Sequence, residues 1–232
     1  MRFATWEHGG TVRAGVVSAH GLHALPPDVT VLDLVRAGLP AALEAGTDAL
    51  SVAPVPVEQA RLLPPLQAPT VRDFVAFEEH VEGVARTMVD GGGVVPEWYE
   101  APTFYFTNPY ALLGAHDDVP VPPGSQLFDF ELEVAAVVGK DGASLTPEQA
   151  REHIFGYTVL NDWSARDLQR REMKVSLGPA KGKDSATTLE LVGGDQPRPT
   201  SSSRTGTPTG SWPWTCGCPS TASRSARTSC PT

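Results

Sequence analysis

Cysteine is scarce in this chain of 232 residues, and its three cysteines, Cys216, Cys218 and Cys230, all lie near the C-terminal end. A disulfide framework therefore does not hold the rest of the chain together. Long hydrophobic runs are also missing: no stretch reaches the roughly 18 apolar residues of a membrane-spanning helix, and the first residues lack the apolar run of a secretory signal. We expect a soluble cytoplasmic protein with no membrane partner.

Positive charge is the next shortage. The chain has 18 basic and 27 acidic residues, which gives a net charge of −9 at pH 7. A nucleic-acid-binding protein normally presents a basic surface to the phosphate backbone, so we expect no nucleic-acid partner. The length allows one large domain or two small ones.

The C-terminal segment lacks both acidic and branched apolar residues. No Asp or Glu follows Asp195, and no Val, Leu, Ile or Phe follows Val192. Of the 37 residues in 196–232, 16 are Ser or Thr, six are Pro and four are Arg. This composition cannot bury a core, so we expect a disordered tail. Its Cys216-Gly-Cys218 motif is weak support for a metal or redox site.

A predicted strand with two acidic residues is the first positive feature. Residues 130–138 are apolar and β-branched after the acids, which favours a strand. Alternate residues of a strand share a face, so Glu131 and Glu133 point the same way as the apolar Ala135 and Val137. Carboxylates on an inward face need compensation, and a hard divalent cation is the simplest form. The alternative is an edge strand whose acids are solvated.

Two further segments add polar side chains to the same region. Ile154 to Leu160 is an apolar run of strand length that ends at Asp162. Residues 164–169 resemble a turn into a helix with Ser164 as N-cap. Residues 178–183 form a predicted tight loop that presents Lys183.

Together these segments resemble one protein family. The run Phe-Glu-Leu-Glu at 130–133, the highly specific run Asn-Asp-Trp-Ser-Ala-Arg-Asp-Leu-Gln at 161–169 and the run Gly-Pro-Ala-Lys-Gly-Lys-Asp at 178–184 are similar, in this order, to the fumarylacetoacetate hydrolase family. The resemblance implies that Glu131, Glu133 and Asp162 are metal ligands. It also implies that Lys183 and Gln169 bind and polarise substrate oxygens and that Arg166 lines the site.

The resemblance gives roles to four more residues. Asp73 and His80 match the family's spacing of a further metal ligand and a general base, although Val75 stands where the family has a tyrosine. Without the resemblance, the same segment is an amphipathic helix with its acids in solvent and a structural or exposed histidine. Tyr105 matches a position that contacts substrate but is otherwise a core residue, and Thr187 is expected beside the metal region.

The expected fold is α+β and mainly β: a mixed β-sandwich roll of the fumarylacetoacetate hydrolase type after a small N-terminal domain. Five prolines within 52–69 mark an extended connection. We therefore predict an N-terminal α+β domain at 1–66, an incomplete catalytic domain at 67–188 and an aberrant tail at 189–232.

The tail itself suggests a hypothesis. The family continues after residue 188 with sheet-forming sequence, whereas this chain does not. Degenerate codons for residues 200–229, read in a shifted frame, can encode two alternating strands joined by an Asn-Gly turn. We therefore predict that residues from about 189 onward are an out-of-frame translation, so that the last strands of the roll are missing.

The function implied by the resemblance is a hydrolase that depends on Mg²⁺ or Mn²⁺, with Ca²⁺ as a further alternative. It would cleave a carbon–carbon bond in a small 1,3-dicarbonyl oxo-acid, such as an acylpyruvate or a fumarylacetoacetate-like acid. The alternatives are a decarboxylase or isomerase of related oxo-acids, or an inactive truncated product. The resemblance also implies that the intact family member is a homodimer.

Overall fold

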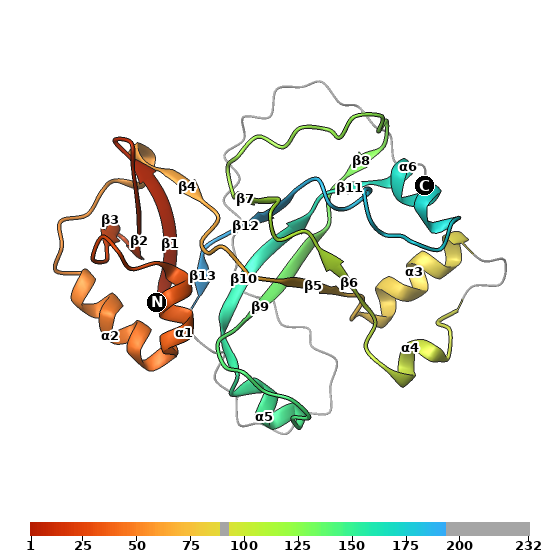
Figure 1. Cartoon of the computed structure of the whole chain (residues 1–232), viewed down its shortest axis with the longest axis horizontal. Helices are drawn as coiled ribbons and strands as arrows, with labels where there is room; N and C mark the ends of the chain where they lie inside the picture. The colour runs from red at the N-terminus through yellow and green to blue at the C-terminus, as the bar shows by residue number, and fades with distance from the viewer. Residues whose placement is uncertain (89–92, 194–232) are drawn as a thin grey trace. The chain divides into compact units, whose positions relative to one another are not determined.

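The computed structural model describes residues 1–88 and 93–193 (Figure 1). Its main feature is a nine-stranded mixed sheet in the order β3-β2-β1-β13-β10-β12-β7, with β4 paired to β1 and β9 paired to β10. The strands of this sheet are β1 (Arg2–His8), β2 (Thr11–Ser18), β3 (Gly21–Ala24), β4 (Arg61–Leu63), β7 (Leu112–Gly114), β9 (Leu132–Val138), β10 (Ile154–Asp162), β12 (Thr187–Leu189) and β13 (Val192–Gly193).

The N-terminal part combines a meander with two helices. Strands β1, β2 and β3 are antiparallel neighbours. Helix α1 (Val31–Ala37) begins with a capping box between Thr30 and Asp33, and α2 (Leu39–Ala49) follows after Gly38. Gly38 has a φ of 90°, which favours glycine and separates the two helices. Val31, Leu34 and Val35 bury one face of α1 against this part's core.

Strand β10 is the centre of the C-terminal half. It pairs with β9 on one side and with β12 and β13 on the other, always antiparallel, while β12 pairs with β7 in parallel. Phe155 of β10 and Val192 of β13 share a core cluster with Phe3 of β1, and Leu160 packs in another with Leu112 and Leu189. The strand predicted from the apolar run of Ile154 to Leu160 is thereby confirmed as β10.

Two short ribbons and four helices complete the described part. The ribbons pair β5 (Val71–Phe74) with β6 (Phe104–Thr107) and β8 (Phe128–Asp129) with β11 (Ser164–Ala165). The helices are α3 (Glu78–Met88), α4 (Glu97–Glu100), α5 (Pro147–Arg151) and α6 (Arg166–Met173), and a single 3₁₀ turn covers Val57–Gln59. The predicted α+β, mainly β class is confirmed.

Three local predictions need correction. Ser164 is not the N-cap of α6: the cap is Ala165, and the Ser164 hydroxyl donates to the Asp162 carbonyl oxygen. The strand predicted from residue 130 begins at Leu132, because the Glu131 N–H donates to the Asn161 side chain instead of joining a regular ladder. Residues 71–80 are not one helix, since a strand precedes α3.

The predicted three-part division of the chain stays a prediction. Leu189 and Val192, which follow the predicted boundary at 188, are buried in strands of the main sheet. The remaining tail, with its proposed change of frame, lies outside the described residues. No helix in the described ranges is both long and apolar enough to cross a membrane.

Candidate metal centre

Four carboxylates from separate segments meet at one place. Asp73 comes from β5, Glu131 from the residue before β9, Glu133 from β9 and Asp162 from the end of β10. Each offers one oxygen that lies within 4.8 Å of the oxygens of the others. This set, called the acid cluster below, brings together all four metal ligands expected from the sequence.

Sheet pairing explains why the acids converge. In the antiparallel ladder between β9 and β10, Glu133 lies opposite Leu160, two residues before Asp162. The Asp162 N–H donates to the Glu131 carbonyl oxygen at 3.0 Å, which fixes the backbone of Glu131 beside Asp162. Because residues of β9 alternate in exposure, Glu133 shares the half-buried face with Ala135 and Val137.

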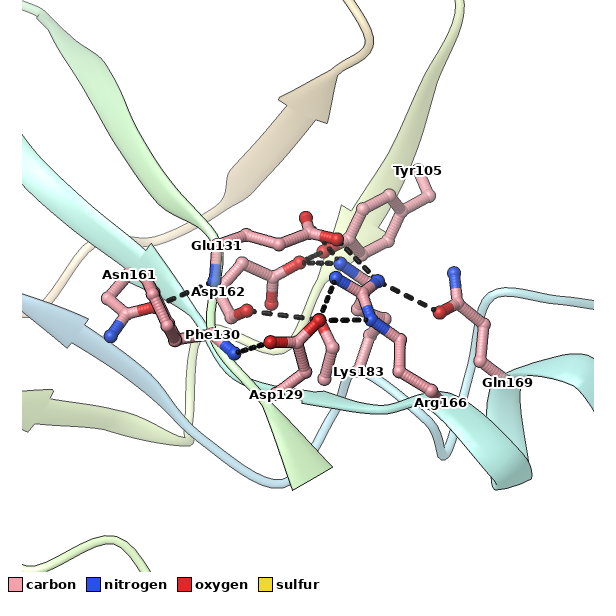
Figure 2. Close-up of polar contacts among 10 residues, drawn as sticks. Tyr105, Asp129, Phe130, Glu131, Asn161, Asp162, Arg166, Gln169 and Lys183 are labelled. Carbon is pink, nitrogen blue, oxygen red and sulfur yellow. Dashed lines mark hydrogen bonds and ion pairs between the residues drawn. The ribbon is translucent and has the colours of Figure 1, made fainter. Parts of the chain in front are cut away.

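Lys183 is the cation at the centre of the acid cluster. Its side chain is 4% exposed, and its Nζ lies 2.7 Å from Glu131 Oε2 and 2.6 Å from Asp162 Oδ2 (Figure 2). The loop after α6 delivers it, as predicted from residues 178–183. A buried ammonium between two carboxylates offsets part of their repulsion and holds their oxygens in a fixed position.

Asp162 is the most deeply buried member of the cluster. It is fully buried, and its Oδ2 accepts hydrogen bonds from Lys183 and from the hydroxyl of Tyr105. Its Oδ1 is buried without a hydrogen-bond partner among the described residues. Burial raises the pKa of Asp162 to about 6, even though Lys183 and Tyr105 favour the ionised form. A buried acceptor with no partner is costly, and this one lies at the acid cluster.

The pKa values of Glu131 and Glu133 shift in opposite directions. Burial and the charges of Asp73, Asp162 and Glu131 raise the pKa of Glu133 to about 8. Burial also acts to raise the pKa of Glu131, but hydrogen bonds and charges from Lys183 and Arg166 outweigh it, so this pKa is lowered. The charge of Lys183 favours ionised Glu133, but it does not outweigh burial and the three neighbouring carboxylates.

Arg166, at the start of α6, connects the acid cluster to a neighbouring acid. Its Nε and Nη2 lie 2.9 Å from Asp129 Oδ2, and its Nη1 lies 2.5 Å from Glu131 Oε1 (Figure 2). Nη1 also donates to Gln169 Oε1 at 3.2 Å, one turn further along α6. Burial opposes the charged form, but Glu131 and Asp129 raise the pKa of Arg166 on balance.

Tyr105 and Thr187 lie beside the cluster. Tyr105 is opposite Asp73 in the β5–β6 ladder, and its hydroxyl reaches Asp162. Burial and the charge of Asp162 raise the pKa of this phenol, which keeps it a hydrogen-bond donor. Thr187 is buried and lies opposite Asp162 in the β10–β12 ladder.

His80 is not brought to the acid cluster. It lies in the first turns of α3, its side chain is exposed, and it makes no contact with the four acids in the part of the chain that the structure describes. Its predicted role as a general base therefore stays a prediction.

An open cleft gives a small molecule access to this region. It measures about 460 Å³, and the side chains that line it include Tyr105 and Lys183. The apolar part of its wall is formed by Phe104, Phe106 and Pro179. A ligand in this cleft would meet the lysine and the phenol that both contact Asp162.

Sequence reasoning missed two residues that shape the site. Asn161 accepts the Glu131 N–H through its side chain, and Asp129 binds the guanidinium of Arg166. Asn161 opens the run at 161–169 that carries the family resemblance, and Asp129 directly precedes the run at 130–133. Asp129 is two residues before Glu131, a spacing that could have marked it as a neighbour of the site.

Comparison with known families matches residues 70–193 to the model described as fumarylacetoacetate (FAA) hydrolase, C-terminal. A fumarylacetoacetase from Oryza sativa subsp. japonica is 31% identical over 158 residues, or 58% of this chain and 35% of that protein. An oxaloacetate tautomerase from Bacillus subtilis is 39% identical over 85 residues, or 34% of this chain and 27% of that protein. The matches therefore span about a third of the length of the first relative and about a quarter of the second.

The fold has relatives among solved structures. A fumarylacetoacetate hydrolase from Exiguobacterium antarcticum aligns over 81% of this chain and 64% of that chain, with a TM-score of 0.56 and 28% sequence identity. The architecture predicted from the sequence motifs is thereby confirmed, as is the resemblance that those motifs indicated.

Proposed function

This chain belongs to the fumarylacetoacetate hydrolase family, and from that premise we propose that it is a divalent-metal-dependent hydrolase of small 1,3-dicarbonyl oxo-acids such as acylpyruvates. The relatives that match this chain include fumarylacetoacetases and an oxaloacetate tautomerase. The observation that carries the proposal is the acid cluster, with its four converging carboxylates and the unpartnered Oδ1 of Asp162.

The donor set fits a hard cation. Its four acids offer only oxygen, the ligand type of Mg²⁺, Mn²⁺ and Ca²⁺. Asp162 Oδ1 is buried and without a hydrogen-bond partner among the residues that the structure describes. The raised pKa of Glu133 reflects burial and neighbouring negative charge that Lys183 does not offset. A divalent cation held by Asp73, Glu131, Glu133 and Asp162 would remove both deficits.

Such an ion, when bound, would supply Lewis-acid polarisation of the substrate carbonyl. Hydrolysis of an acylpyruvate then requires water to attack the acyl carbonyl carbon and the bond to the central carbon to break. The bonding electrons become the enolate of pyruvate, which takes up a proton at carbon. In this proposal Lys183 and Gln169 would donate hydrogen bonds to the enolate oxygen, and Arg166 would donate to the substrate carboxylate.

We propose that His80 is the general base that removes a proton from the attacking water. A general base must come within about 3 Å of the water that it deprotonates. Since the imidazole is exposed on α3 in this structure, the role requires it to approach the acid cluster when substrate is bound.

The proposal is tested first by metal binding and then by turnover. We expect Mn²⁺ to raise the melting temperature of the full chain, because an ion that binds only the folded state stabilises it. Glu131→Ala should abolish that shift, whereas Glu44→Ala, an exposed site on α2, should preserve it. Turnover is measured as pyruvate released from acetylpyruvate. A Mn²⁺ shift that survives in Glu131→Ala refutes the ligand assignment.

A tautomerase or isomerase of related oxo-acids is the second candidate. Two observations favour it: the B. subtilis relative is an oxaloacetate tautomerase, and within the described part of the chain His80 makes no contact with the acid cluster. Both reactions need the same stabilised enolate, but only hydrolysis needs an activated water. Product analysis separates them, since hydrolysis makes two acids from one and tautomerisation conserves the carbon skeleton. A third outcome, an inactive product, is indicated by a melt without a cooperative transition.

A further inference from the structure

The guanidinium of Arg166 is divided between two kinds of partner. One edge, formed by Nε and Nη2, faces a single oxygen of Asp129 at 2.9 Å from each nitrogen. The other end, Nη1, faces Glu131 and Gln169 (Figure 2). The planar guanidinium therefore has one edge held outside the acid cluster and one nitrogen directed into it.

We propose that Asp129 is the positioning residue of Arg166: it holds the Nε–Nη2 edge so that Nη1 stays directed at the carboxylate of an oxo-acid substrate. The substrate part of this inference rests on the proposed function. Asp129 itself lies outside the set of four acids that could share an ion.

Asp129 is the partner of Arg166 that keeps its contact during the proposed reaction. Glu131 now engages both cations, with Oε1 toward Arg166 and Oε2 toward Lys183. If Glu131 binds a metal ion, its hold on Nη1 weakens, because its charge is then shared with the ion. Asp129 is not one of the four acids that could bind the ion, so its charge stays available to Arg166. It can therefore hold the guanidinium when Nη1 becomes available to an anionic substrate.

The position of Asp129 is itself fixed by the backbone. Its Oδ1 accepts the N–H of Phe130 at 2.9 Å, which leaves Oδ2 for the arginine. In the β8–β11 ladder, Asp129 lies opposite Ser164, two residues before Arg166. The carboxylate is 48% exposed, and exposed ion pairs add little stability. Orientation of the arginine, rather than stability of the fold, is therefore its main contribution.

The same contact extends to Gln169. Arg166 Nη1 donates to Gln169 Oε1 at 3.2 Å. Since Oε1 accepts from the arginine, the orientation of the amide is fixed, and its donor group, Nε2, points away from Arg166 and can bind a substrate oxygen. Asp129 thus sets the direction of two substrate-facing groups on α6 without touching the substrate.

The first test examines the metal-free protein by NMR. The Nε–H resonance of Arg166 is identified by its absence in Arg166→Lys. We expect Asp129→Asn to shift this resonance and to accelerate its exchange with water, because the charged acceptor is lost. Asp129→Glu should restore a protected signal, and Asp141→Asn, at an exposed position outside the helices and strands, should leave it unchanged. An unaltered resonance in Asp129→Asn overturns the proposal.

The second test measures ligand binding with Mn²⁺ present. Oxalate serves as a stand-in for the oxo-acid carboxylate. We expect Asp129→Asn to weaken oxalate binding about tenfold, by analogy with the lower end of the losses caused by mutating residues that orient metal ligands. Mn²⁺ affinity and melting temperature should stay close to those of the unaltered protein. Unchanged oxalate affinity overturns the substrate role of Asp129.

The two tests fail separately from the proposed function. If the unaltered protein binds neither Mn²⁺ nor oxalate, the metal-dependent function is refuted, and with it the substrate role of Asp129. The NMR comparison needs no metal and still decides whether Asp129 orients Arg166.

Discussion

Replacing Glu133 by glutamine should stabilise the metal-free protein at alkaline pH and abolish its stabilisation by metal. Glu133 lies among three other carboxylates, and their charges together with burial raise its pKa to about 8. The amide of glutamine has nearly the same shape but carries no charge. If the acid cluster binds a cation, removal of this charge should stabilise the metal-free protein and weaken binding of the cation.

The magnitude follows from the pKa. A change of one unit in a pKa corresponds to about 1.4 kcal/mol. The pKa of Glu133 moves from an ordinary value of 4.5 to about 8. Full ionisation would then cost the folded state about 5 kcal/mol. Because Glu133 is only half-buried, solvent reduces this value, and we expect about 1–2 kcal/mol.

The sign is set by the direction of the shift. A carboxyl with a raised folded-state pKa binds its proton more tightly in the folded than in the unfolded chain. Between about pH 4.5 and 8 the unfolded chain loses this proton first, so rising pH removes stability from the metal-free protein. The loss should be complete above pH 8.

Urea unfolding in EDTA at pH 5, 7 and 9 measures this directly. The unaltered chain should lose stability over this range, and Glu133→Gln should lose about 1–2 kcal/mol less. Mn²⁺ should then stabilise the unaltered chain at pH 9 but not the variant. Glu44→Gln, at an exposed helical position, controls for loss of one negative charge. If Glu133→Gln destabilises the metal-free protein at pH 9, our account of the field at Glu133 is wrong.

Three further outcomes are expected. Lys183→Met should destabilise the metal-free protein by about 3–5 kcal/mol, because it leaves Glu131 and Asp162 facing each other without their cation; urea unfolding measures this, and a neutral effect would contradict it. Tyr105→Phe should cost about 1–3 kcal/mol, since Asp162 Oδ2 loses a donor, and thermal melts should show the loss. Mn²⁺ affinity, measured by calorimetry, should tighten from pH 6 to pH 8 as Glu133 is deprotonated; a flat profile would contradict this.

The strands of the site could be predicted from the sequence because apolar runs and alternation of apolar and polar residues lie within each strand. The mostly apolar run from Ile154 to Leu160 predicted a strand, and strand β10 covers it and continues to Asp162. Alternation in β9 correctly placed Glu133 on the face of Ala135 and Val137. What alternation could not show is that Glu131 lies outside the ladder, because a side-chain acceptor from Asn161, 30 positions away, replaces the regular partner.

The helix and strand around Asp73 and His80 were beyond local reasoning. Residues 71–80 have the composition of an amphipathic helix, yet Val71–Phe74 form a strand because Phe104–Thr107 pair with them. This pairing places Asp73 opposite Tyr105 and at the acid cluster, while His80 falls in α3. A contact between segments about 30 residues apart decides which face each residue takes, and the sequence of either segment alone does not contain that information.

The acid cluster is hard to explain as a structural device. A buried ion pair is commonly no more stabilising than apolar side chains of similar size, and here four carboxylates share Lys183 and the partly exposed Arg166. One carboxylate oxygen, Asp162 Oδ1, has no partner among the described residues, and burial together with the neighbouring carboxylates raises the pKa of Glu133 to about 8. An apolar core at this position would give a more stable sheet. The arrangement becomes favourable only when a further positive charge enters, which is why we place a divalent cation there.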